Sequence, residues 1–136
     1  MKKTIIEDIG LLILRAGAGS MMLTHGFPKL MRFFSDEPIK FMDFLGLGPV
    51  VSLSLAVSAE FLCAILIIIG FKTRLATIPI MITMLTAALI AHAADPFGRK
   101  ELPLLYFIVF LCILIFGAGK YSLDGMSNRK SMYYKS

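Results

Sequence analysis

The chain has 136 residues, of which 57% are hydrophobic and only 17% charged, and its net charge at pH 7 is +5. A soluble domain of this length needs a polar shell, and a chain with a mean hydropathy of +0.81 has too little polar sequence to form one. The composition therefore predicts a membrane protein. The Lys and Arg residues lie at the edges of apolar stretches, as orientation signals do, so the positive charge does not indicate a nucleic-acid partner.

The first apolar stretch runs from about residue 9 to residue 33 and carries Arg15, His25 and Lys29. A helix needs roughly 20 residues to cross the hydrocarbon core of a bilayer, so this stretch is long enough to span it. Pro28 should break or kink its end, because proline lacks the backbone N–H of a helical residue. Since Arg15 interrupts the apolar run, we expect the stretch to remain attached as a span and not to be cleaved as a signal peptide.

Three further stretches approach or reach the length of a span. One runs from about residue 49 to residue 70 with Glu60 near its middle, and the next runs from about residue 75 to residue 94 with His92 near its end. The last extends from about residue 103 to residue 118. Together with the first stretch, they predict an all-α, polytopic membrane protein built as an antiparallel bundle of four transmembrane helices.

The links between these stretches differ in length. The second link, residues 71 to 74, is nearly minimal, so the helices on either side of it should form an antiparallel hairpin. The first link, residues 35 to 48, is longer and includes Phe41, Phe44 and Leu45, an apolar tract that is expected to lie along the membrane surface.

The remaining signals concern the starts of two helices and the C-terminal tail. Pro49 and Pro103 suit the first turns of their helices, where a missing N–H has little effect. Residues 119–136 form a polar tail after the last span. We therefore expect a single transmembrane domain that covers residues 1–136, with the tail in the cytoplasm.

Orientation is predicted from the Lys and Arg residues at the ends of the spans. With the N-terminus inside, the cytoplasmic set is Lys2, Lys3, Lys72, Arg74, Lys120, Arg129, Lys130 and Lys135. The opposite set is Lys29, Arg32, Lys40, Arg99 and Lys100. Because cytoplasmic loops carry the excess of positive residues, this count favours a multi-pass protein of the bacterial plasma (inner) membrane with both termini in the cytoplasm.

Two ionisable residues fall inside the spans, where each costs about 2.5–3.5 kcal/mol on insertion scales and needs a partner. Arg15 should lie roughly 10 Å from the cytoplasmic end of its helix and Glu60 near the midplane, a difference that an Arg side chain can bridge. We therefore predict an intramembrane ion pair between them. Glu60 also shares an i, i+4 stripe with Ser52 and Ala56, a face that lets helices approach closely. The pair could be purely structural or could form a proton or ligand site.

A second polar group is expected near the outer interface. It consists of His25, Lys29, His92, Asp95 and Glu101. His25 and His92 have similar depth when the helical rise is counted from the cytoplasmic side. These residues could line a pocket for an anionic or quinone-like head group, or relay protons. Alternatively, the basic groups snorkel separately to water and Glu101 complements a helix N-terminus.

No metal site is predicted. Two His residues make a poor zinc site, since zinc usually takes three or four protein ligands. Cys63 and Cys112 lie in apolar stretches and form no CxxC motif, so packing is the expected role of each.

Several motifs resemble the DoxX family of four-helix bacterial membrane proteins, in an order and spacing that cover roughly residues 9 to 125. The motifs are Arg15, His25-Gly26-x-x-Lys29, Glu60, Gly70-Phe71-Lys72-Thr73-Arg74 and Gly117-Ala118-Gly119-Lys120-Tyr121-Ser122-Leu123-Asp124. The resemblance implies a membrane location, a four-helix bundle and a loose link to redox chemistry, because some DoxX-like proteins are associated with quinone-linked sulfur oxidation or with oxidative-stress complexes. The absence of a CxxC motif argues against the chemistry of the vitamin K epoxide reductase type.

Three functions stay open at this point. The chain could be a membrane subunit or accessory of a quinone-linked or oxidative-stress oxidoreductase assembly, with a quinone as cofactor and membrane or cytoplasmic redox proteins as partners. It could be a small proton-coupled carrier, which with four spans would have to act as a homo-oligomer. It could also be a non-catalytic organiser that contacts partner proteins through its polar tail. The residues identify no catalytic group, so the sequence does not decide whether the chain is an enzyme.

Overall fold

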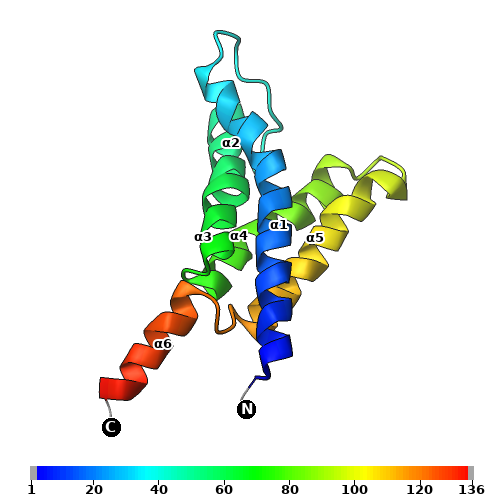
Figure 1. Cartoon of the computed structure of the whole chain (residues 1–136). Coiled ribbons are helices and arrows are strands. Elements are labelled where there is room, and N and C mark those ends of the chain that lie inside the picture. Colours follow the sequence, from blue (N-terminus) through cyan, green and yellow to red (C-terminus); the bar gives the residue numbers. More distant parts are fainter. Residues whose placement is uncertain (1–2, 135–136) are drawn as a thin grey trace.

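The structure, a computed structural model, describes residues 3–134, and all regular structure in this part of the chain is helical (Figure 1). The elements in chain order are α1 (Ile5–Met31), the 3-10 turn η1 (Arg32–Phe34), α2 (Pro49–Val57), the π-helical η2 (Ser58–Cys63), α3 (Ala64–Ile69), α4 (Thr73–Thr86), the π-helical η3 (Ala87–Ala91), α5 (Phe97–Phe116) and α6 (Leu123–Tyr134). The predicted all-α class is confirmed for these residues. Lys2 and Lys135, two residues of the orientation count, lie outside them.

Two continuous helices are long and apolar enough to cross a membrane by length and composition. One combines α2, η2 and α3 over Pro49–Ile69, and the other combines α4 and η3 over Thr73–Ala91. Both agree with the stretches predicted from the sequence to within three residues at each end. The turn between them is short, as expected, and Gly70 at the end of α3 adopts a left-handed conformation with φ +73°.

The structure differs from the sequence-based limits at several positions. α1 continues through Pro28 to Met31, so of the expected break or kink at this proline the break does not occur. α5 begins at Phe97 after Pro96, and Pro103 lies inside the helix. Hydropathy marks only the apolar part of α5 and misses the polar turns that precede it.

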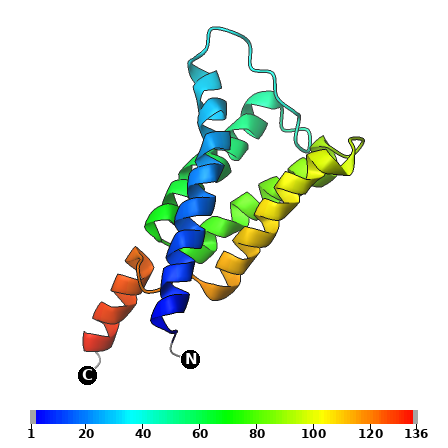
Figure 2. The ribbon, with the colours of Figure 1, turned by 45° about the vertical axis from the view of Figure 1, so that its right-hand side comes forward.

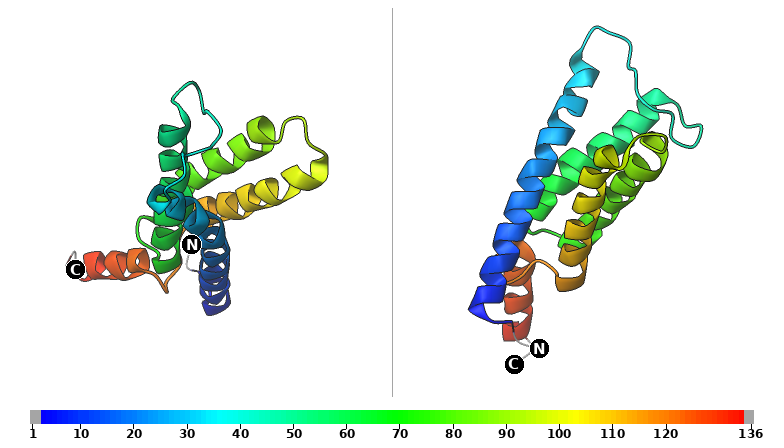
Figure 3. Two further views of the ribbon diagram at one scale, coloured as in Figure 1. Left: turned by 90° about the horizontal axis from the view of Figure 1, so that it is seen from above. Right: turned by 90° about the vertical axis from the view of Figure 1, so that its right-hand side faces the viewer.

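The polar tail also differs from expectation, because part of it folds into α6. Seen from above in Figure 3, α6 points away from the hairpin formed by α4 and α5. None of its residues is buried.

The long helices pack as two pairs. α1 lies along η2 and α3, and α4 lies along α5. The pairs approach each other near the turn that precedes α4 and diverge toward the other end of the molecule (Figures 1 and 2). Fully buried side chains fill the space where they approach, among them Met22, Ile67, Ile80, Phe110 and Ile113. In a bilayer this contact is stabilised mainly by van der Waals packing, because lipid tails are as apolar as the core.

Arg15 lies at the end where the helices converge and is completely buried. Its Nη1 donates to the carbonyl oxygens of Ile67 at 2.9 Å and Ile68 at 3.0 Å, and its Nη2 donates to that of Tyr121 at 2.6 Å. Carbonyls in the last turn of a helix lack intrahelical partners, so Arg15 satisfies the end of α3 and fastens the segment after α5 to it. The predicted Arg15–Glu60 pair is not formed, because the guanidinium of Arg15 donates its hydrogen bonds to backbone carbonyls, two of them at the end of α3.

Asp124 binds backbone groups at the same end of the molecule, at the turn between α3 and α4. Its carboxylate accepts hydrogen bonds from the backbone N–H groups of Lys72 at 2.8 Å and Thr73 at 2.9 Å, at the start of α4. Its own N–H donates to the carbonyl of Gly70 at 2.9 Å. We call the cluster of Arg15, Gly70 and Asp124, with the backbone groups that they bind, the junction. Two of the motifs in the sequence, at residues 70–74 and 117–124, thus serve to hold helix ends together.

Candidate functional site

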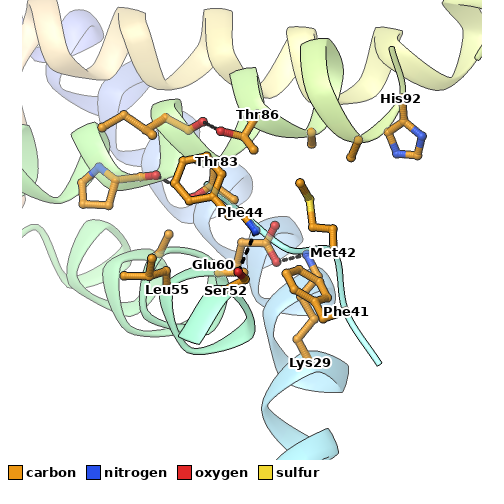
Figure 4. Close-up of a pocket in the computed structure, with 16 residues that line it drawn as sticks. Lys29, Phe41, Met42, Phe44, Ser52, Leu55, Glu60, Thr83, Thr86 and His92 are labelled. Atoms are coloured by element: carbon orange, nitrogen blue, oxygen red, sulfur yellow. Dashed lines mark hydrogen bonds and ion pairs between the residues drawn. The ribbon is translucent and has the colours of Figure 1, made fainter. Parts of the chain in front are cut away.

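A cavity of about 500 Å³ lies between α2–η2 and α4–η3, at the end where the helix pairs diverge (Figure 4). Most of its wall is apolar and comes from these helices and from the link between η1 and α2. The polar side chains that line it are Lys29, Ser52, Glu60, Thr83, Thr86 and His92. Binding sites for small amphiphilic molecules have this composition, a mostly apolar wall with a few polar groups that fix the ligand.

The main polar feature of the cavity is an ion pair between α1 and η2. Lys29 Nζ donates to Oε2 of Glu60, as the dashed line in Figure 4 marks. The Glu60 side chain is 3% exposed, whereas the Lys29 side chain is 25% exposed. A carboxylate inside a span is tolerated when a cation neutralises it, and here that cation is Lys29 and not Arg15.

Gly26 brings the two charges together. A β-carbon at this position would lie 2.5 Å from the carbonyl oxygen of Glu60 and 2.8 Å from the nitrogen of Phe61, so the backbones of α1 and η2 touch here. Lys29 follows three residues later, about one helical turn along α1. The spacing Gly26-x-x-Lys29 therefore sets the position of the ammonium group beside Glu60.

Both π-helical segments border the cavity. Ala59 and Glu60 of η2 lie on one wall, and Ala87 and Ala91 of η3 lie on the opposite one. A π-turn is rare and locally widens the helix, and such turns often occur at functional sites. In this chain one of them carries the buried carboxylate and the other leads directly to His92.

His92 directly follows η3 and pairs with an acidic residue of the loop after it. Its Nδ1 lies 2.7 Å from Oδ2 of Asp95, and Arg99 lies 3.9 Å from the same oxygen. The hydrogen bond from His92 lowers the pKa of the Asp95 carboxyl below its ordinary value, and the positive charges of Arg99 and Lys100 act in the same direction. Asp95 thus stays ionised and fixes the ring of His92 at the cavity.

The link between η1 and α2 folds over the cavity and contributes Phe41, Met42 and Phe44 to its wall. The N–H of Phe44 donates to Oγ of Ser52 at 2.8 Å, and this hydroxyl donates to the carbonyl of Gly48 at 2.6 Å. These bonds hold the apolar tract of the link against α2.

Comparison with known proteins identifies the family. The DoxX family model matches residues 10–93. The chain belongs to the DoxX family. It is 36% identical over 124 residues to inner membrane protein YphA of Escherichia coli strain K12, a match that covers 84% of this chain and 87% of the relative. It is 31% identical over 135 residues to inner membrane protein YqjF of the same strain, which covers 96% and 99% of the two chains. No solved structure matches the chain.

The resemblance drawn from the sequence motifs is thus confirmed, and the protein is a DoxX-family inner membrane protein. The matched segment includes Arg15 of the junction as well as Lys29, Glu60 and His92 of the cavity. The family match therefore covers both ends of the molecule described above, although α5 and α6 lie outside it.

The structure divides the polar group that the sequence predicts at the outer interface. Lys29 and His92 line the cavity together, and Asp95 contacts it through His92. Glu101 is exposed on α5 and does not line the cavity. His25 is not part of the wall either.

His25 points toward α5 instead. Its ring meets the ring of Tyr106 edge to face, with centroids 5.6 Å apart and an interplanar angle of 86°. Because successive residues on a helix are about 100° apart, the contact of Gly26 with η2 turns the preceding His25 away from that helix. The expected cavity shared by His25 and His92 is thus not formed, and Glu60 takes the place that the prediction gave to His25.

Other cavity residues could have been found from the sequence. Ser52, Ala56 and Glu60 all line the wall, and they form the small-residue stripe already visible in the second span. Thr83 and Thr86 had no such signal, since isolated Thr residues in an apolar helix are common. In residues 3–134, no three His, Cys, Asp or Glu residues are grouped so that they could hold a metal ion.

Proposed function

We propose that the protein crosses the inner membrane four times, through α1, α2–η2–α3, α4–η3 and α5, as one antiparallel bundle within a single domain of residues 1–136. The lengths of the helices support this arrangement. α1 has 27 residues and α5 has 20, which correspond to about 40 Å and 30 Å of helix, enough for the hydrocarbon core.

We further propose that the end with the junction faces the cytoplasm. The start of α1 and the tail helix α6 lie at this end of the molecule (Figure 1). The basic residues Lys72, Arg74 and Lys120 flank the helix ends there, as the positive-inside rule requires. In a variant with Cys63 and Cys112 replaced by Ala, a cysteine at Lys40 should react with a membrane-impermeant thiol reagent in intact cells, whereas one at Lys130 should not. The reverse labelling pattern would contradict this orientation.

The function that the site supports best is the binding of a quinone-like amphiphile, as a membrane subunit or accessory of an oxidoreductase assembly. The observation that carries this proposal is the apolar cavity with the Lys29–Glu60 pair in its wall. Its volume of about 500 Å³ lies within the range of small-molecule pockets. The ion pair offers a polar anchor for a head group, while the apolar wall suits its ring and tail.

The residues of the cavity can bind a head group but supply no electrons, which is why we propose an assembly. Lys29, Glu60 and His92 can bind, orient and exchange protons with a head group, but electrons require a separate donor or acceptor. A membrane or cytoplasmic redox protein would supply it, and a second copy of the chain could complete the site.

The test is to identify what the protein retains when it is extracted together with its native lipids. Mass spectrometry of the wild type should detect a quinone or quinol at a higher ratio to protein than in the bulk membrane extract. A Lys29→Gln/Glu60→Gln variant, which removes both charges and keeps the side-chain lengths similar, should lose this enrichment. Glu101→Gln is the matched control, because it neutralises an exposed carboxylate outside the cavity wall. Equal enrichment in all three proteins, or none in the wild type, would contradict the proposal.

One observation favours proton-coupled transport as a second candidate function. Glu60 is a membrane-embedded carboxylate that lines a cavity and is paired with a cation, an arrangement found along proton and substrate pathways. This alternative predicts proton-dependent uptake into liposomes that contain the purified protein, and loss of uptake in Glu60→Gln. Binding of a quinone without any such uptake would support the first function.

A further inference from the structure

The polar groups of the cavity differ in the hydrogen bonds that they have left to make. An ammonium group has three donors and no acceptor, and a carboxylate has only acceptors. Lys29 uses one donor on Oε2 of Glu60. In the described part of the chain Oε1 of Glu60 accepts no hydrogen bond, and protein atoms do not fully cover it. Since Glu60 lines the cavity, this oxygen is available to a ligand.

The hydroxyl groups of the wall have already used their protons. Thr83 Oγ1 donates to the carbonyl of Pro79 at 2.8 Å, and Thr86 Oγ1 donates to that of Ile82 at 2.9 Å. Each can therefore only accept a hydrogen bond from a ligand.

His92 adds another acceptor. The Asp95 carboxylate can only accept, so Nδ1 of His92 carries the proton of their 2.7 Å contact. In the neutral ring Nε2 then has a free lone pair. Lys29 is thus the main donor of a wall whose other free groups are mostly acceptors.

We infer that the cavity selects the reduced, hydroxyl-bearing form of an aromatic head group, a quinol, over the corresponding quinone. This inference rests on the proposed function. The O–H of a quinol can donate to Oε1 of Glu60, while the oxygen atom of this hydroxyl accepts a hydrogen bond from Lys29. A quinone has two acceptor oxygens and no donor. It can accept from Lys29, but it would leave Oε1 of Glu60 without a hydrogen bond and place a carbonyl dipole against the negative charge, which disfavours binding.

The test compares a decyl-substituted 1,4-benzoquinone with its chemically reduced quinol, under anaerobic conditions, on protein in lipid nanodiscs. Protein-free nanodiscs correct for partition into the lipid. The wild type should bind the quinol at least about tenfold more tightly, because the bond at stake involves a charged acceptor. In Glu60→Gln the amide offers both a donor and an acceptor, so the preference should fall to nearly one, with tighter binding of the quinone.

Two further variants make the result decisive. Glu101→Gln should keep the full preference, since Glu101 lies outside the cavity wall. If Glu60→Gln does not fold, the Lys29→Gln/Glu60→Gln variant replaces it, because no charge is left unpaired, and its binding of the quinol should fall at least to the level of the quinone. Equal or tighter binding of the quinone by the wild type would overturn the selectivity but not the proposed function. Binding of neither form would overturn the proposed function itself, and an unchanged preference without the Glu60 carboxylate would overturn the role of Glu60.

Discussion

α1 places a basic side chain at each of two regions, and the two differ in how completely that side chain is bonded. At the junction, both terminal nitrogens of Arg15 bond to backbone carbonyls, and the residue is completely buried. At the cavity, Lys29 has a single partner, Glu60, and is 25% exposed. Arg15 is bonded through both terminal nitrogens and only its buried Nε lacks a partner, so this charge holds the fold together. Lys29 has free donors at a cavity and can bind a ligand. The predictions below test this difference.

The largest effect is expected at the junction. Arg15→Met should lower the free energy of unfolding by about 2 kcal/mol or more, because the carbonyls of Ile68 and Tyr121 lose their donor and each orphaned polar group costs about 1–3 kcal/mol. The carbonyl of Ile67 keeps its hydrogen bond from the N–H of Gly70. Arg15→Lys should have an intermediate effect, since an ammonium group lacks the planar fork of the guanidinium. Thermal unfolding in lipid nanodiscs measures both. A stability change in Arg15→Met no larger than that of an exposed substitution such as Arg129→Met would contradict the structural role.

A smaller effect is expected where the two backbones touch. Gly26→Ala should destabilise the protein by about 1–3 kcal/mol, because the added methyl group overpacks the contact with the backbone of Glu60. Gly17→Ala on the same helix is the matched control. Nothing lies within 4 Å of a β-carbon there, so it should stabilise the helix by about 0.5–1 kcal/mol. If both substitutions shifted the melting temperature in the same direction, the close approach at Gly26 would be refuted.

The ion pair predicts that the effects of substituting Lys29 and Glu60 on stability are coupled, whereas those of substituting Arg15 and Glu60 are not. Lys29→Gln and Glu60→Gln should be non-additive by about 0.5–3 kcal/mol, because each leaves the other charge without its partner. Arg15→Gln and Glu60→Gln should be additive within about 0.5 kcal/mol, since the two residues share no hydrogen bond. Double-mutant cycles of unfolding free energy measure both quantities. Coupling between Arg15 and Glu60 in place of Lys29 and Glu60 would restore the pair expected from the sequence alone.

The smallest effect concerns pH. The pKa of Asp95 is lowered in the folded protein, so its ionised form adds stability above the ordinary Asp value of about 4, and this stability is lost as the pH falls through the lower folded pKa. Asp95→Asn should therefore lower the melting temperature slightly at pH 6 and by a smaller amount at pH 3. Asp36→Asn, in the exposed link, is the control and should have little effect at either pH. A larger loss at pH 3 than at pH 6 would contradict the assigned contact with His92.

The sequence predicted the helices well but the contacts between them poorly. Apolar length and turn residues located the second and third long helices closely, since hydropathy reports directly on what a bilayer accepts. The start of α5 and the helical part of the tail were missed, because polar turns of a helix carry no hydropathy signal.

For the candidate site, depth was predictable but direction was not. Lys29 and His92 were assigned to one outer pocket and do line one cavity, since the helical rise indicates the end of the molecule at which a residue lies. His25 was assigned to that cavity as well, although Gly26 turns it toward Tyr106. The partner of Glu60 was misassigned for a related reason. Reach alone allowed Arg15, but its guanidinium donates to carbonyls at the end of α3, and a sequence pattern does not show such contacts.

The central claim is that the divergent end of the molecule holds a binding cavity anchored by Lys29 and Glu60. The most direct measurement is an experimental structure of the protein in its native lipids. We predict density for a ring-shaped head group between η2 and η3, within hydrogen-bonding distance of Lys29 Nζ and the Glu60 carboxylate. A structure in which α4 packs directly against α2, with Lys29 turned to solvent and no space beside Glu60, would contradict the claim.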